Sequence, residues 1–302
     1  MILNAVTTSA CLSDKLASPR TACVHSVFRR AVNILGDNVW ISLHPRHVPL
    51  NPYSIGLDVD ASRTSTGFLE CYRGETVVIE DSCIILGKRR VTIRLGGARQ
   101  VRLNLKALTD SRRQDAGQCL SQLLLTVQSF PTESPFLRGV IALDRKSSEP
   151  AGLDDPFTRR SYSIIAGISR AWKVGSGKHL GNEVARTIGF GVGLTPSGDD
   201  FITGMLGATE FFASASPLRK IMLEAVTPNI HSTTLPSYYM LRAALDGCYP
   251  EVLIRMLLAI GHDEVSMSRE LKVLRTIGAT SGDDMLAGII LTLKMLSTRG
   301  ES

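Results

Sequence analysis

The sequence predicts an α+β protein: a small antiparallel β barrel or sandwich at the N-terminus, followed by an α-helical C-terminal domain. Three observations lead to this fold class. Short apolar runs typical of strands extend from Val39 to about Leu105, and apolar residues recur at helical spacing beyond Pro156. The motif Ser-Gly-Asp-Asp occurs at 197–200 and again at 281–284, each time at the expected start of an apolar helix. These two motifs are interpreted as pseudo-repeated helix starts.

The N-terminal part combines an irregular start with a series of short strands. Residues 1–24 are polar and irregular, and a short amphipathic stretch follows from Val24 to Leu35. Alternation of apolar and polar residues is clearest from Arg90 to Leu95, which indicates a sheet with one face in water. Several short strands separated by Gly, Asn, Asp and Pro are typical of a barrel or a sandwich. The strands are expected at 39–43, 76–79, 82–86, 91–95 and 101–103.

The C-terminal part is expected to be helical. Gln114 to Gln128 carries leucines at helical spacing. Residues 129–156 hold several prolines and the strand-like run Gly139–Leu143, so this segment is the expected joint between a β domain at 1–145 and a helical domain at 146–302. Further helices are expected at about 157–172, 181–188, 198–213, 217–227, 234–246, 250–260, 264–277 and 282–297.

Composition and charge narrow the function classes. The longest apolar runs are too short to span a bilayer and the N-terminus has no secretion signal, so a cytoplasmic protein without a membrane role is expected. The net charge of +6 is concentrated between Lys88 and Arg113, which favours a solvated strand face over a docking surface for an acidic partner. No aromatic residues are interleaved there, so nucleic acid is not an expected partner. Neither a phosphate loop nor a dinucleotide fingerprint is complete, and no nucleotide or redox cofactor is indicated.

Each Ser-Gly-Asp-Asp motif has the form of a capping box. Its Ser would be the N-cap and its second Asp would lie at N3, where the carboxylate reaches back to the cap amide. Because one N3 carboxylate completes the box, Asp199 and Asp283 would remain spare. The first motif also follows the glycine-rich run Gly189–Pro196. Glycines at alternate positions let a ligand approach main-chain amides, and such a loop before a helix is a natural anion site.

The two helix starts, 84 residues apart, are predicted to face each other across one pocket. Four carboxylates in one pocket require a cation such as Mg²⁺ or raised pKa values. We therefore expect the four aspartates to be catalytic and to be possible Mg²⁺ ligands: Asp199, Asp200, Asp283 and Asp284. Ligand-binding residues are expected from the loop, from both motifs and from a third, hydroxyl-rich helix start that is otherwise an N-cap before Pro236. They are Gly191, Gly193, Thr195, Ser197, Gly198, His231, Ser232, Thr233, Thr280, Ser281 and Gly282.

The run Gly193–Leu206 resembles a bacterial family of domains of unknown function, one branch of which is described as the third, smaller subunit of the oxamate carbamoyltransferase of anaerobic allantoin breakdown. Gly278–Gly288 and Phe28–Asn33 match further stretches of that family. The resemblance implies carbamoyl transfer between carbamoyl phosphate and an amide or amine acceptor, by a complex of different chains. Ala279 stands where the family commonly has His, so any role carried by that His would be absent here.

Three functions are therefore weighed. The leading hypothesis is a subunit of a carbamoyltransferase-type complex that binds carbamoyl phosphate or its acceptor, a small anionic substrate, at the glycine loop and the two acidic helix starts. The first alternative is a stand-alone metal-dependent hydrolase that uses the aspartate cluster. The second is a non-catalytic scaffold subunit whose capping boxes are only structural.

Overall fold

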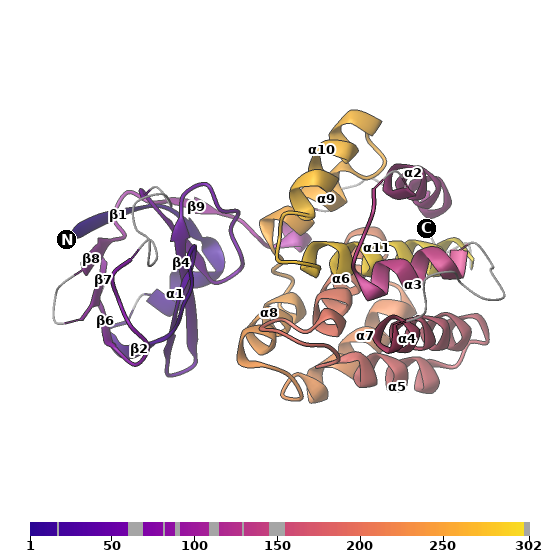
Figure 1. The fold of residues 1–302 in the computed structure, drawn as a ribbon, viewed down its shortest axis with the longest axis horizontal. Coiled ribbons are helices and arrows are strands. Elements are labelled where there is room, and N and C mark those ends of the chain that lie inside the picture. The colour runs from indigo at the N-terminus through magenta and orange to yellow at the C-terminus, as the bar shows by residue number, and fades with distance from the viewer. Residues whose placement is uncertain are drawn as a thin grey trace. The chain divides into compact units, whose positions relative to one another are not determined.

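The protein divides into two compact units, Met1–Asn104 and Leu105–Ser302 (Figure 1). The computed structural model describes residues 1–16, 18–59, 69–80, 82–87, 91–108, 115–128, 130–144 and 155–298. In the sequence, the boundary between the two units falls about forty residues before the one predicted near 145. The reason is that the helices formed by 116–128 and 135–144 pack against the last helix of the chain, which makes them part of the helical unit.

The N-terminal unit is a closed β barrel. Its strands are β1 (Ile2–Ser9), β2 (Arg20–Val27), β3 (Val32–Gly36), β4 (Val39–Pro45), β5 (Ser54–Leu57), β6 (Thr76–Glu80), β7 (Cys83–Leu86), β8 (Val91–Arg94) and β9 (Arg99–Val101). Eight strands follow one another as β5-β4-β3-β2-β6-β7-β8-β1, and β1 closes the ring by pairing with β5. The predicted antiparallel barrel is thus confirmed as a barrel, but its sheet is mixed, because β1–β8, β1–β9 and β4–β5 are parallel pairs.

Four strands of the barrel, β1, β2, β3 and β5, were missed by the sequence pattern. Residues 1–24 were expected to be irregular, yet they form β1 and the start of β2. The stretch Val24–Leu35 belongs to an antiparallel β2–β3 pair. The apolar residues of β1 do not alternate with polar ones. The strand is held by its neighbours: Ile2–Asn4 pair with β8, while Ala5–Thr8 pair with β5. Pairing of this kind is decided by the partner strands rather than by intrinsic preference.

The barrel core follows the predicted alternation. In β8, Val91 and Ile93 are buried whereas Thr92 and Arg94 point outward. β6 and β7 repeat this pattern, so apolar side chains from successive strands fill the interior. Of the basic run that the sequence singled out, Arg94, Arg99 and Arg102 are exposed, and the residues at 88–90, 112 and 113 lie outside the described residues.

The C-terminal unit is helical, as predicted. Its helices are α2 (Ala116–Gln128), α3 (Pro135–Asp144), α4 (Pro156–Lys173), α5 (Gly177–Thr187), α6 (Ser197–Phe212), α7 (Pro217–Val226), α8 (Leu235–Leu245), α9 (Glu251–Ala259), α10 (Glu264–Leu274) and α11 (Ser281–Ser297). A short helix, α1 (Ser13–Leu16), belongs to the barrel unit. The run Gly139–Leu143 is helical, so the strand predicted there is wrong. It lies in α3, where Phe136, Leu137 and Val140 are buried together at helical spacing.

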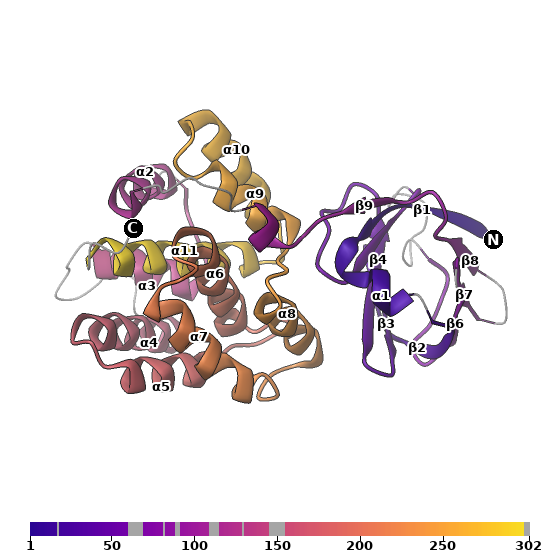
Figure 2. The same ribbon diagram turned by 180° about the vertical axis from the view of Figure 1, so that it is seen from behind.

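Helices α6 and α11 form the centre of this unit. All residues of α6 from Ser197 to Glu210 are buried, and so are those of α11 from Gly282 to Leu293. A helix that is buried on every side must be covered by other helices, and Figures 1 and 2 show α11 running between its neighbours. Within the described part of the chain, no helix combines the length and apolarity needed to cross a bilayer.

Candidate functional site

The starts of α6 and α11 meet inside the helical unit. The hydroxyl of Thr195, two residues before α6, lies 3.3 Å from the hydroxyl of Ser281. The two helices then cross in direct backbone contact: a Cβ placed on Gly204 would be 2.0 Å from the Met285 carbonyl oxygen, and one on Gly288 would be 2.2 Å from that of Phe201. The glycine four residues after each motif therefore allows the close crossing that brings the two acidic motifs together.

The predicted capping boxes are wrong. The N-caps are Pro196 and Thr280, and neither side chain makes a capping hydrogen bond. Each helix begins at the Ser of its motif, because the Pro196 and Thr280 carbonyls already accept from the amides of Asp199 and Asp284 respectively. The first Asp of each motif consequently lies at N3 and the second at N4, one position further into the helix than the capping box requires.

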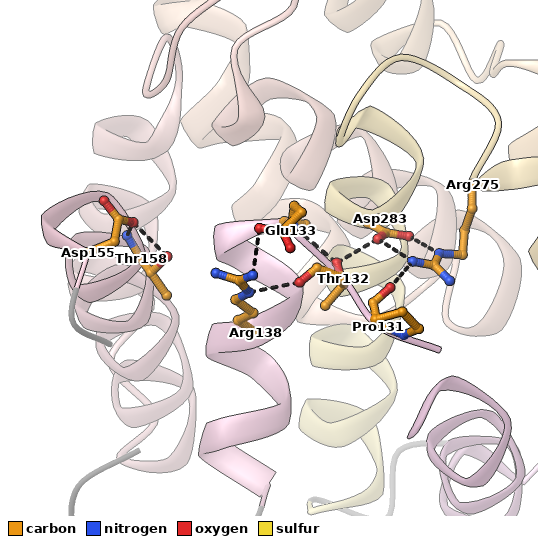
Figure 3. A network of polar contacts seen from close by, with 9 residues as sticks. Pro131, Thr132, Glu133, Arg138, Asp155, Thr158, Arg275 and Asp283 are labelled. Carbon is orange, nitrogen blue, oxygen red and sulfur yellow. Dashed lines mark hydrogen bonds and ion pairs between the residues drawn. The ribbon is translucent and has the colours of Figure 1, made fainter. Parts of the chain in front are cut away.

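The first Asp of each motif is held by protein partners on both oxygens. Asp199 accepts from the Gly189 amide at 2.8 Å and from the Thr233 hydroxyl. Asp283 accepts from Arg275 at 2.6 and 3.0 Å and from the Thr132 hydroxyl at 2.6 Å (Figure 3). The two aspartates that the sequence left spare are thus anchors that fasten distant segments to the two helix starts.

The anchor at Asp283 extends into a polar network. Arg275 also donates to the Pro131 carbonyl oxygen at 2.5 Å, and Arg138 donates to the Thr132 carbonyl at 2.8 Å. Figure 3 shows these groups joining the segment before α3 to the start of α11. Arg275 is well buried for an arginine, with 21% of its side chain exposed, so this ion pair is shielded more than a surface pair.

Replacement of Arg275 by Gln is expected to lower the free energy of unfolding of the helical unit by about 2 kcal/mol, because it leaves Asp283 with one hydroxyl partner. The matched control is Arg242→Gln, which removes an exposed pair with Asp246 of 3.7 Å and should cost less than about 0.5 kcal/mol. Urea unfolding followed by helical circular dichroism measures both. Equal losses would contradict an anchoring role for Arg275.

The second Asp of each motif is buried with unmet hydrogen-bonding capacity. Asp200 is 1% exposed, and neither of its carboxylate oxygens has a hydrogen-bond partner among the described residues. Asp284 is fully buried, accepts from Ser134 at 2.5 Å through one oxygen, and has no such partner for the other. Buried polar groups are normally paired, so these free acceptor positions are exceptions that call for an explanation.

Burial dominates the protonation of this pair. It raises the pKa of Asp200 well above its ordinary value; the Ser281 hydroxyl nearby opposes the rise, and the charge of Asp284 adds to it. Burial also raises the pKa of Asp284 to about 6, against the effect of the Ser134 hydroxyl. Near neutral pH Asp200 therefore retains its proton readily, whereas Asp284, with a pKa of about 6, is mostly ionised. The pair can thus both accept and donate hydrogen bonds.

The glycine loop leads directly to this pair. Gly189, Gly191 and Gly193 all have positive φ, of 75°, 130° and 100°, a conformation that favours glycine. Among the described residues, the N–H groups of 191–195 make no backbone hydrogen bond. At its tip Val192 is 86% exposed. The loop thus presents main-chain donors beside the start of α6.

The remaining predicted residues have mixed positions. Thr280 and Ser197 are near enough to Asp284 for their hydroxyls to lower its pKa, against burial. His231 stacks on Tyr238 with ring centroids 4.9 Å apart, and no contact within the described residues joins it to the aspartate pair. The other predicted binding residues serve packing: a Cβ on Gly198 or Gly282 would strike a backbone carbonyl oxygen, and the Ser232 carbonyl lies against Gly189.

Sequence reasoning missed the residues that come from outside the motifs. Thr132 and Ser134 lie in the segment interpreted as a joint, and Arg275 precedes the second motif. One signal was present: Ser134 followed by Pro135 is a helix-start pattern, and the Ser134 hydroxyl accepts from the Leu137 amide at 2.9 Å. No local pattern predicts that the same hydroxyl donates to Asp284.

The positions of the four aspartates bear on the predicted Mg²⁺ site. Among the described residues, no group of three or more His, Cys, Asp or Glu side chains is arranged to hold a metal ion. The oxygens of Asp199 and Asp283 already accept from protein donors, which leaves two carboxyl groups for a cation that prefers six ligands. The arrangement does not fit a protein-held magnesium centre, and no catalytic step is assigned to one.

Two protein-family models match the chain over the parts that form the barrel and the site. The model described as oxamate carbamoyltransferase subunit AllH matches residues 187–293, and the AllH family N-terminal domain matches residues 4–100. The chain belongs to the AllH family. The AllH match contains the glycine loop and both acidic motifs, whereas the N-terminal match spans nearly the whole barrel. This confirms the family that the motifs resembled. No solved structure matches the chain.

Proposed function

We propose that this chain is a subunit of an oxamate carbamoyltransferase-type complex and that it binds a reactant at the paired starts of α6 and α11. The AllH family description supports the reaction class and the presence of other subunits. The observation that carries the binding role is Asp200, a buried carboxyl group whose two oxygens have no partner among the described residues. A ligand with N–H groups would supply the missing donors.

Both reactants have the required chemistry. Oxamate and carbamoyl phosphate each combine a planar NH₂–C=O group with an anionic group. The NH₂ donors suit the free acceptors of Asp200 and Asp284, and a proton retained on Asp200 suits the carbonyl oxygen. The anionic group suits the main-chain amides of residues 191–195 at the positive end of α6. This division removes the repulsion between the acids and an anion, because each part of the ligand meets its own partners.

The proposed role of the site is to bind and orient. The hydroxyls of Thr195 and Ser281, 3.3 Å apart, stand between the loop and the acid pair and would fix the plane of the ligand. Transfer of a carbamoyl group depends on orientation and electrostatic stabilisation more than on a protein nucleophile. Partner subunits would supply whatever further groups the reaction requires.

Replacement of Asp200 by Ala tests the proposal. It removes no hydrogen bond to any of the described residues, so folding should be retained. The affinity of the chain with its co-purified partners for oxamate should fall at least about tenfold. The matched control is the exposed Asp246→Ala, which should bind as the parent does. Isothermal titration calorimetry measures both. An unchanged affinity for oxamate and for carbamoyl phosphate would contradict the proposed site.

The same variants separate the alternatives. Unchanged turnover by an intact complex that contains Asp200→Ala would favour the non-catalytic scaffold. Hydrolysis by the isolated chain that requires Mg²⁺, together with Mg²⁺ binding that is lost in Asp200→Ala, would favour the metal-dependent hydrolase.

A further inference from the structure

A cavity lies at the end of α6 that is far from the acidic motif, where that helix passes into α7. Its volume is about 680 Å³, and its wall includes Lys106, Glu210, Arg219 and Lys220. Glu210 is ten residues beyond Asp200 on the same helix, which places it about 15 Å further along the axis. The cavity is therefore separate from the paired helix starts, and its volume lies in the range that accepts a metabolite-sized molecule.

The cavity wall carries an excess of positive charge. Its basic residues are Lys106, Arg219 and Lys220, and its acidic residues are Glu210 and Glu224. Arg219 forms a buried ion pair with Glu210, while Lys220 lies 3.8 Å from Glu224 in an exposed pair of little strength. The wall thus has a net charge of +1, and the positive end of α7 adds to it.

Arg219 has hydrogen-bonding capacity that the protein does not use. The residue is 6% exposed, and its Nη1 atom has no partner among the described residues. The Tyr249 hydroxyl is fully buried and likewise has no partner there. Burial raises the pKa of Tyr249, and the charge of Arg219 opposes the rise. Two buried donors therefore lack an acceptor within the described part of the chain.

We propose that this cavity binds a small phosphate-bearing anion. Ionised phosphate oxygens accept hydrogen bonds and donate none. They match the free N–H groups of a guanidinium and the ammonium groups of two lysines. The hydroxyls of Ser214 and Ser216 on the same wall provide further donors. This site is distinct from the proposed oxamate site and does not depend on the proposed function.

Titration of the full chain with inorganic phosphate, against sodium chloride of matched ionic strength, tests the site. Lys220→Gln should weaken phosphate binding at least about threefold, since it removes one exposed cation. The double variant Glu210→Gln/Arg219→Gln should weaken it at least about tenfold, and it leaves no buried charge without a partner. Lys272→Gln, an exposed lysine on α10 outside the cavity, is the matched control and should bind as the parent does.

Three results would overturn this site: no heat with phosphate, equal affinities for the parent and Lys220→Gln, or a loss of binding in Asp200→Ala instead, which would place phosphate at the helix starts. Circular dichroism establishes that each variant is folded. If the double variant does not fold, Lys106→Gln combined with Lys220→Gln decides the question, because both side chains are exposed.

Discussion

Replacement of Gly204 by Ala is expected to destabilise the helical unit by more than about 3 kcal/mol. The added Cβ would lie 2.0 Å from the Met285 carbonyl oxygen, which is backbone of the central helix α11 and has no rotamer to change. The two helices would have to separate, and their contact contributes much of the core of this unit. Gly288→Ala should behave alike, since its Cβ would lie 2.2 Å from the Phe201 carbonyl oxygen.

A helix glycine with free space provides the control. At Gly181 in α5 an added Cβ would lie 3.8 Å from Ala225 and 3.9 Å from Ile221, which is ordinary contact. Gly181→Ala should therefore stabilise the unit by up to about 1 kcal/mol, through helix propensity alone. If the crossing of α6 and α11 is as close as described, urea unfolding should show that Gly204→Ala lowers the free energy of unfolding and that Gly181→Ala raises it. A small or favourable effect of Gly204→Ala would contradict that crossing.

Stability of the helical unit is expected to fall by about 3 kcal/mol between about pH 4 and pH 8 through Asp284. Burial raises the pKa of this group from 3.8 to about 6 in the folded state. The folded protein then binds more protons than the unfolded chain, so the stabilisation is complete below pH 4 and is lost as the pH rises through 6. Asp200 should act in the same direction, because burial raises its pKa as well.

Asp284→Asn isolates this contribution. The amide oxygen can still accept from Ser134, so at about pH 8 the variant should be more stable than the parent by about 3 kcal/mol, and much of the pH dependence should vanish. The neighbouring Asp283→Asn is the control. It should be less stable than the parent at that pH, because it breaks the ion pair with Arg275. Urea unfolding at several pH values measures both. A variant less stable than the parent at pH 8 would show that Asp284 is stabilising when ionised.

A stabilising substitution at a buried acid would have a functional meaning. Proteins keep unpaired buried carboxyl groups where a ligand needs them, at a cost in stability. If Asp284→Asn stabilises the fold while Asp200→Ala loses affinity for oxamate, the acid pair is retained for binding rather than for folding. This outcome would favour the carbamoyltransferase role over the scaffold.

Much of the fold could be predicted from local patterns. The alternation in β8 and the helical spacing beyond Pro156 each reflect one buried face, and burial is recorded in the spacing of apolar residues. Local patterns were misleading where a partner decides the structure. Strand β1 has no regular alternation of apolar and polar residues, and it forms because neighbouring strands flank it on both sides. Gly139–Leu143 is helical because Phe136 and Val140 share a buried face.

The sequence by itself determined the two acidic motifs, the glycine loop before the first of them, and the resemblance to the family to which the chain belongs. It did not determine which aspartate of each pair is free. That depends on Gly189, Thr233, Thr132 and Arg275, which engage the first Asp of each motif and leave Asp200 without a partner among the described residues. Only the tertiary structure decides this, because hydrogen bonds over tens of residues or more leave no local pattern in the sequence.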